Sequence, residues 1–144
     1  MKVTRIDHIG VCVGSLDAAI PLWLRLLTGL AQGSREVVGA QKTEAAFLDA
    51  GNTAAGGAAV ELIAPMAGDA NPGLEKFLAR NGGKAGLHHL ALAVDDLAAA
   101  LRELDAAGVP LIDKSPRPGA RGHLVGFLHP KATDGVLIEL VQDH

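Results

Sequence analysis

The stretch that decides the fold occurs twice in this chain. Residues 6–13 read Ile6-Asp7-His8-Ile9-Gly10-Val11-Cys12-Val13, and residues 87–94 read Leu87-His88-His89-Leu90-Ala91-Leu92-Ala93-Val94. Further along each copy, Val60-Glu61-Leu62-Ile63 returns as Ile138-Glu139-Leu140-Val141. The aligned histidines lie 81 residues apart and the glutamates 78. The sequence therefore predicts a duplicated unit that opens with a histidine-bearing strand and closes with a glutamate-bearing strand.

Both copies predict the element order β-α-β-β-β. In the first copy, about 6–66, we expect a helix capped by Ser15 from Leu16 to about Leu27, and strands at 6–13, 35–38, 43–49 and 58–63. Pro21 predicts a kink or a weakened turn in that helix. A connector at about 67–86 predicts a short helix that starts at Asn71-Pro72.

The second copy, about 87–142, predicts a helix capped by Asp96 and ending at Gly108, with strands at 87–94 and near 111–113, 123–128 and 136–141. We expect an α+β fold in which two tandem modules, with one sheet each, form a single domain over 1–144.

The alternation of side chains along a strand sorts the polar candidates. His89, Ala91 and Ala93 should share one face of their strand, and His88 should point to the other. Because the repeat pairs His8 with His89, His88 is not expected to be a ligand. Glu61 and Glu139 stand in otherwise apolar strands, where an isolated carboxylate is costly to bury. Two histidines and two glutamates at corresponding places of two modules predict one shared site for a divalent metal ion.

Bulk composition excludes several classes of function. The net charge is −3 and the Lys and Arg residues are scattered, so no nucleic-acid partner is expected. No apolar stretch reaches membrane-spanning length, and no membrane partner is expected. The single cysteine, Cys12, fits a reducing compartment, so we expect a cytoplasmic protein.

These segments resemble the methylmalonyl-CoA epimerase family of the vicinal-oxygen-chelate superfamily, which also contains glyoxalase I and extradiol dioxygenases. The resemblance covers residues 6–142 and rests on the strands at 6–10 and 86–89, on Val94-Asp95-Asp96-Leu97, and on Phe127-Leu128-His129-Pro130-Lys131 before Gly135-Val136-Leu137-Ile138-Glu139-Leu140. Arg35-Glu36-Val37-Val38 adds to the narrower match. The turn at 52–59 looks longer than the family usually has.

The resemblance implies His8, Glu61, His89 and Glu139 as ligands of one divalent ion, which could be Co, Mn, Ni, Zn or Mg. It implies Glu44 and Glu139 as the acid/base pair, with Glu44 reaching the cavity beside the metal without binding it. The implied activity moves a proton at the carbon between a thioester and a carboxylate and so interconverts (R)- and (S)-methylmalonyl-CoA. The expected partners are an acyl-CoA substrate and a second copy in a homodimer.

Rival functions share the fold. A glyoxalase I-like lyase or isomerase would use the same four ligands, and Glu44 with the His129-Pro130-Lys131 stretch argues against it. An extradiol dioxygenase needs two histidines and one carboxylate around iron, so Glu61 as a fourth ligand argues against that reaction. A non-catalytic protein that sequesters a small molecule would need no base.

Overall fold

One mixed sheet of eight strands forms the body of the protein in a computed structural model that describes residues 1–51 and 56–143. The strand order is β2-β3-β4-β1-β5-β8-β7-β6. The strands are β1 (Val3–Cys12), β2 (Ala31–Val38), β3 (Thr43–Asp49), β4 (Ala59–Pro65), β5 (Gly86–Val94), β6 (Arg117–Pro118), β7 (Leu124–Phe127) and β8 (Ile138–Gln142). The helices are α1 (Leu16–Leu26), α2 (Pro72–Arg80) and α3 (Leu97–Ala106), with short 3-10 turns η1 (Gly39–Gln41), η3 (Ala120–Gly122) and η4 (Pro130–Thr133).

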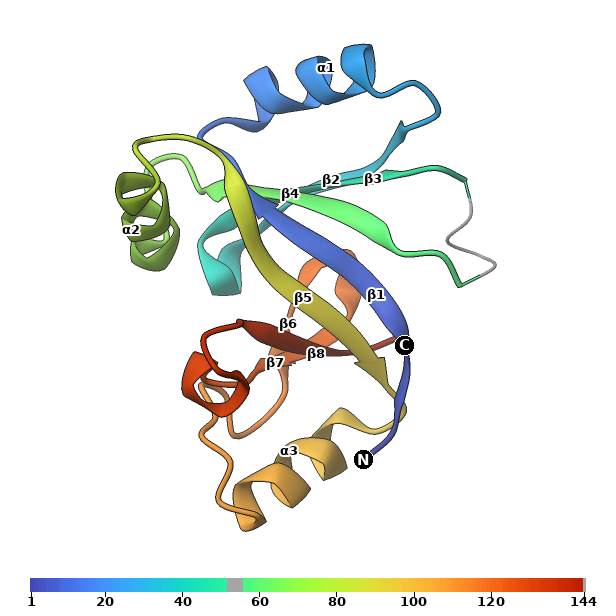
Figure 1. Ribbon diagram of the computed structural model, residues 1–144, viewed down its shortest axis with the longest axis vertical. Coiled ribbons are helices and arrows are strands. Elements are labelled where there is room, and N and C mark those ends of the chain that lie inside the picture. The colour runs from blue at the N-terminus through green and yellow to red at the C-terminus, as the bar shows by residue number, and fades with distance from the viewer. Residues whose placement is uncertain (52–55, 144) are drawn as a thin grey trace.

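The two modules are joined edge to edge through their first strands. β1 pairs with β4 in parallel and with β5 in antiparallel orientation, and β5 in turn pairs with β8 in parallel. The expected α+β duplication is therefore present, but the expectation of one sheet per module is wrong. The first strands of the two modules, β1 and β5, form hydrogen bonds with each other, so the modules share a single curled sheet (Figure 1).

The helices form where the caps predict. The side chain of Ser15 accepts from the backbone N–H of Ala18, Asn71 accepts from Gly73 and Leu74, and Asp96 accepts from Ala99. The first helix continues through Pro21 to Leu26. No helix within residues 1–51 and 56–143 has both the length and the apolar character needed to cross a bilayer.

The helices cover the two ends of the sheet. α1 packs its buried face on Val11, Ala46 and Leu62, and α3 packs on Val94 and Leu140. In Figure 1, α1 and α3 lie at opposite ends of the molecule, and β1 and β5 cross the middle between them. On their outer face, Ile9 and Leu87 line a groove together with Phe77 and Arg80 of α2.

Two expected features differ at the edges. The strand predicted near 111–113 is wrong: Leu111 makes a single bridge to Leu128, and the edge strand is β6 at 117–118 instead. Pro110 has no N–H to donate to a ladder there, whereas Arg117 and Pro118 pair directly with Val125 and Leu124. Residues 52–55 of the long turn lie outside the described residues.

Candidate metal and substrate site

The four central strands each contribute one side chain to a single cluster. Glu61 comes from β4, His8 from β1, His89 from β5 and Glu139 from β8, which are neighbours in that order in the sheet. The register sets the heights of these side chains: Gly10 lies beside both Glu61 and His89, and Ala91 lies beside both His8 and Glu139. All four residues are buried.

Their donor atoms converge on one point. One ligand atom from each residue lies within 4.8 Å of the others. Nε2 of His8 is 3.1 Å from Nε2 of His89, and Nε2 of His89 is 3.3 Å from Glu61 Oε1 and 3.0 Å from Glu139 Oε2. Donors that share an ion at about 2.1 Å are about 3.0–3.4 Å apart for right-angled to tetrahedral arrangements. The spacing, and two ring nitrogens aimed at one another, therefore fit a divalent metal ion.

The pKa values of these residues indicate how their charges are balanced when no metal ion is bound. Burial lowers the pKa of His89, but hydrogen bonds to Glu139 and Glu61 outweigh burial and raise it to about 9. Burial also opposes the charged form of Glu61, yet its hydrogen bonds to His8 and His89 lower its pKa to about 2. Imidazolium and carboxylate groups thus balance one another, and a metal ion would replace the protons on the rings.

A β-bulge precedes each histidine. The pairing of β1 with β5 shifts register between Ile6 and His8 and again between Gly10 and Val11, opposite His88. Each extra residue is thereby turned toward the same side as the histidine that follows it. Nδ1 of His8 lies 2.7 Å from Asp7 Oδ2, and Nδ1 of His89 lies 2.9 Å from Nδ1 of His88. The expectation that His88 faces away from the site is wrong for this reason.

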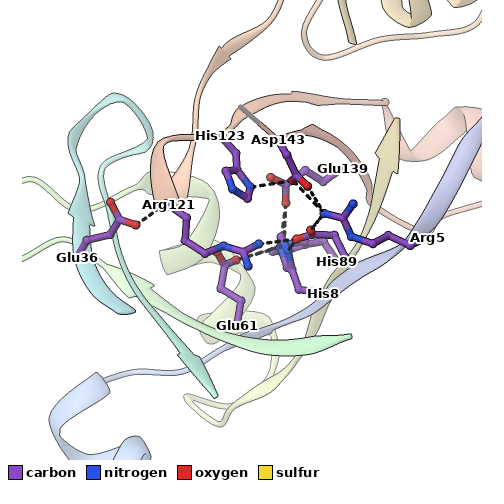
Figure 2. A network of polar contacts seen from close by, with 10 residues as sticks. Arg5, His8, Glu36, Glu61, His89, Arg121, His123, Glu139 and Asp143 are labelled. Carbon is purple, nitrogen blue, oxygen red and sulfur yellow. Dashed lines mark hydrogen bonds and ion pairs between the residues drawn. The ribbon is translucent and has the colours of Figure 1, made fainter. Parts of the chain in front are cut away.

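Asp7 is fixed by two arginines, Arg5 and Arg121, both of which are labelled in Figure 2. Its Oδ1 accepts from Arg5 at 2.8 Å, and its Oδ2 accepts from Arg121, whose guanidinium lies 3.9 Å from the centre of the Phe47 ring. Burial raises the pKa of Asp7, but the hydrogen bond from His8 and the charge of Arg121 hold it well below its usual range. Arg121 lies in η3 of the second module, so this network also ties the two modules together.

His123 lies close to the cluster. Its Nδ1 lies 3.5 Å from Asp143 Oδ1, and its side chain is only 18% exposed. Figure 2 shows it turned toward Asp143 and the cluster. His144, which the sequence does not predict to be a ligand, lies outside the described residues.

A cavity of about 360 Å³ opens on the cluster. Glu61, His89 and Glu139 form part of its wall, together with His88 and Arg117. Other residues of the wall are Gln41 at the end of η1, Thr43 at the start of β3 and Asn71, the cap of α2. Within the described part of the chain, Nε2 of Gln41 is buried and has no hydrogen-bond partner. The cavity therefore brings polar donors and two carboxylates to one chamber.

Comparisons with known proteins agree with this site. Residues 7–127 match the family described as the Glyoxalase/Bleomycin resistance protein/Dioxygenase superfamily. The uncharacterized protein YqjC of Bacillus subtilis is 39% identical, over 97% of this chain and 93% of that protein. The ethylmalonyl-CoA/methylmalonyl-CoA epimerase of Cereibacter sphaeroides is 32% identical, over 97% and 98%.

A solved structure extends the match to three dimensions. A variant of Streptomyces coelicolor methylmalonyl-CoA epimerase in complex with 2-nitronate-propionyl-CoA superposes with a TM-score of 0.86 at 36% identity, covering 99% of both chains. The chain belongs to the methylmalonyl-CoA epimerase family.

Glu44 is the predicted site residue that the structure does not bring to the epimerase-family cavity. It lies on β3 between Thr43, which lines the cavity, and Ala45, which packs with Cys12 and Ile63. Alternation puts Glu44 on the opposite face with Ala46, which packs beneath α1. Its partners across the sheet are Val37 and Ala64. Within the described residues, Glu61 and Glu139 are the carboxylates that line the cavity.

Proposed function

We propose that this protein is a metal-dependent epimerase that interconverts (R)- and (S)-methylmalonyl-CoA. The observation that carries the proposal is the buried four-donor cluster at the wall of a cavity large enough for an acyl group, in a chain of this family. His8, Glu61, His89 and Glu139 would hold one divalent ion, with Co, Mn, Ni, Zn and Mg as the predicted candidates. When bound, that ion supplies Lewis-acid stabilisation of the negative charge that develops as the proton leaves the substrate.

The protein's own side chains divide the remaining tasks. Glu139 lines the cavity and is proposed as one of the two groups that move the proton at the carbon between the thioester and the carboxylate. Hydrogen bonds from the ring nitrogens oppose its protonation and hold its pKa below the ordinary value in spite of burial. Arg117 and the unpaired amide of Gln41 offer donors for the oxygens of the substrate. The apolar side chains of Phe127 and Leu137 exclude water from the acyl end.

Epimerisation needs a second proton-transferring group on the other face of the substrate carbon, and two residues are candidates for it. The family resemblance assigns this role to Glu44, whereas Glu61 is the carboxylate that shares the cavity with Glu139. If Glu44 transfers the proton, Glu44→Gln should keep metal content and cut turnover by about 100-fold or more. Near-normal turnover in Glu44→Gln would remove Glu44 from the mechanism. Glu139→Gln serves as the comparison and should lose turnover in either case.

Exchange of the substrate proton tests the function directly. Protein loaded with Co(II) should replace the C2 proton of methylmalonyl-CoA with deuterium in heavy water, and a chelator should abolish that exchange until metal is restored. NMR of the substrate reports the exchange. Absence of exchange from the loaded protein, together with turnover of a glutathione hemithioacetal, would favour a glyoxalase-type reaction instead. Binding of methylmalonyl-CoA without exchange would indicate sequestration.

We further propose a cytoplasmic homodimer. The one cysteine, Cys12, is free and buried, which suits a reducing compartment. Ile9, Leu87 and Val136 are exposed apolar residues that line one groove of about 670 Å³. A contiguous apolar surface of this kind supports a contact with a second copy of the chain.

A further inference from the structure

The duplication places Asp7 and His88 in equivalent positions. Each residue precedes a ligand histidine by one position and is the residue that the β1–β5 pairing skips at a register shift. Each also contacts Nδ1 of the histidine that follows it. Asp7 does this with a carboxylate at 2.7 Å and His88 with a ring nitrogen at 2.9 Å. The sheet therefore provides each ligand histidine with one partner on the side away from the cluster.

The direction of the His88–His89 hydrogen bond follows from the cluster. Nε2 of His89 faces Glu61, Glu139 and His8, so it carries no proton when it binds a metal ion. The neutral ring of His89 then has its proton on Nδ1 and must donate it. Nδ1 of His88 must accept that proton, which leaves the single proton of a neutral His88 on Nε2. Ligand histidines generally need such an acceptor to fix the ring and its tautomer.

The two partners differ in what surrounds them. Asp7 is closed off by Arg5 and Arg121 and is 5% exposed. His88 is half-buried, stands edge-on to the ring of Phe77, and lines both the metal-site cavity and the adjoining apolar groove. Within the described residues, the contact of its Nδ1 with His89 is the polar contact its ring makes. Nε2 of His88 is thus available to a molecule in the cavity.

We propose that His88 has two roles: it positions His89 by accepting the Nδ1–H of that ring, and its own Nε2–H donates a hydrogen bond to an oxygen of the acyl-CoA substrate. The second role rests on the proposed function, whereas the first concerns metal binding alone. The two ring nitrogens of His88 therefore link the metal ligand to the substrate. The carboxylate of Asp7 makes no such link in the other module.

The tautomers can be read from the unmodified protein. In protein labelled with ¹⁵N-histidine and loaded with Zn(II), two-bond proton–nitrogen NMR correlations should show His88 with its proton on Nε2 and His89 with its proton on Nδ1. Loss of one set of signals in His88→Asn assigns His88. A proton on Nδ1 of His88 would overturn the first role, because that nitrogen could then accept no hydrogen bond.

Two variants separate the roles. His88→Phe keeps a ring but no nitrogen and should weaken Zn(II) binding by about 10–100-fold in competition with a chelator. His88→Asn places Oδ1 where Nδ1 was, so it should restore Zn(II) binding close to that of the unmodified protein. It should still weaken calorimetric binding of methylmalonyl-CoA by about tenfold, because the Nε2–H is gone.

Each result decides one role. Unchanged Zn(II) affinity in His88→Phe overturns the positioning role, and unchanged methylmalonyl-CoA affinity in His88→Asn overturns the substrate role. His129→Asn is the matched control, because the His129 ring accepts from the backbone of Lys131 in a separate turn and Asn can do the same. If His88→Phe does not fold, the NMR tautomers decide the first role. If the unmodified protein fails to bind methylmalonyl-CoA, the substrate role falls with the proposed function, and the metal measurements still stand.

Discussion

At the scale of single residues, the two ligand histidines rest on different supports. His8 lies beside Ala91, but His89 lies beside Gly10. A Cβ at position 10 would come within 2.1 Å of Cε1 of His89, and the other nearby atoms also belong to that ring. On its far side the ring contacts His88, with 2.9 Å between the two Nδ1 atoms. Gly10 is therefore required by a metal ligand rather than by a turn.

Gly10→Ala should displace His89 and weaken both metal binding and the fold. We expect a loss of about 1–3 kcal/mol in the free energy of unfolding, the usual range for overpacking a buried site. Chelator competition should show weaker Zn(II) binding. Gly14→Ala is the control, since an added Cβ there meets nothing within 4 Å. Equal behaviour of the two variants would show that the ring of His89 is free to shift.

The pKa of His89 predicts how stability of the metal-free protein depends on pH. Burial lowers this pKa, but Glu139 and Glu61 raise it from 6.5 to about 9. A raised pKa means that the folded state binds the proton more tightly than the unfolded state does. The contribution is therefore complete below pH 6.5 and is lost as pH rises through about 9.

Urea unfolding of the metal-free protein should accordingly show falling stability between pH 6.5 and 9. Saturation with Zn(II) should remove that fall, because the ion replaces the ring proton and binds more tightly as pH rises. A metal-free protein whose stability stays flat across this range would contradict the charge pairing of His89 with the two glutamates.

At the scale of elements, the connector helix α2 forms a wall of the cavity and depends on its cap. Oδ1 of Asn71 accepts from Gly73 at 2.8 Å and from Leu74 at 3.1 Å, while Nδ2 donates to the carbonyl of Gln41 at 2.7 Å. One side chain thus starts the helix and ties it to η1, which carries Gln41. The position of α2 over the metal site follows from these bonds and from Leu74, which packs on Cys12 and Ile63.

Asn71→Ala should lower the free energy of unfolding by about 1 kcal/mol, since the first N–H groups of α2 lose their acceptor. Thermal unfolding should shift down by about 2–4 °C. Asn71→Ser retains a cap but cannot reach Gln41, so it should recover most of that stability. Equal losses in the two variants would assign the effect to the bond with Gln41 rather than to the cap.

The element pattern was largely predictable because its signals are local. Ser15, Asn71 and Asp96 each cap the helix that the sequence assigns to them. The strands with His8, Glu61, His89 and Glu139 lie within a few residues of their expected ranges, because the same strand pattern occurs twice in the sequence. The structure brings these four side chains together as the repeat suggests, while their binding of metal stays a prediction.

What escaped prediction depends on neighbouring strands. The bulges that turn Asp7 and His88 toward the site exist only in the pairing of β1 with β5, so strict alternation misplaced His88. The ion pair that Arg121 makes with Asp7 crosses between the modules and leaves no local pattern in the sequence. Glu44 stands between Thr43, which lines the cavity, and Ala45, so alternation along β3 does not place it in that wall, and its part in the reaction stays a prediction.

At the scale of the whole molecule, fusion of the two modules into one sheet places the site and an apolar surface on opposite sides of the same strands. The inner sides of β1 and β5 carry His8 and His89, and the outer sides carry Ile6, Ile9 and Leu87. Leu87 is 76% exposed, and it lines one groove with Ile9 and with Phe77 of α2. Formation of a dimer across it would support the strands that hold the ligands.

A homodimer is therefore predicted to bury this central surface rather than the exposed side of α1. Sedimentation at micromolar concentration should give a dimer for the unmodified protein, and Leu87→Glu should shift it to monomer because a carboxylate is costly to bury without a partner. Leu26→Glu is the matched control, since Leu26 is 64% exposed on α1. Dissociation by Leu26→Glu alone would place the contact on the helix, and a clean monomer of the unmodified protein would remove the dimer altogether. Zn(II) binding by the Leu87→Glu monomer should persist, because all four donors come from one chain.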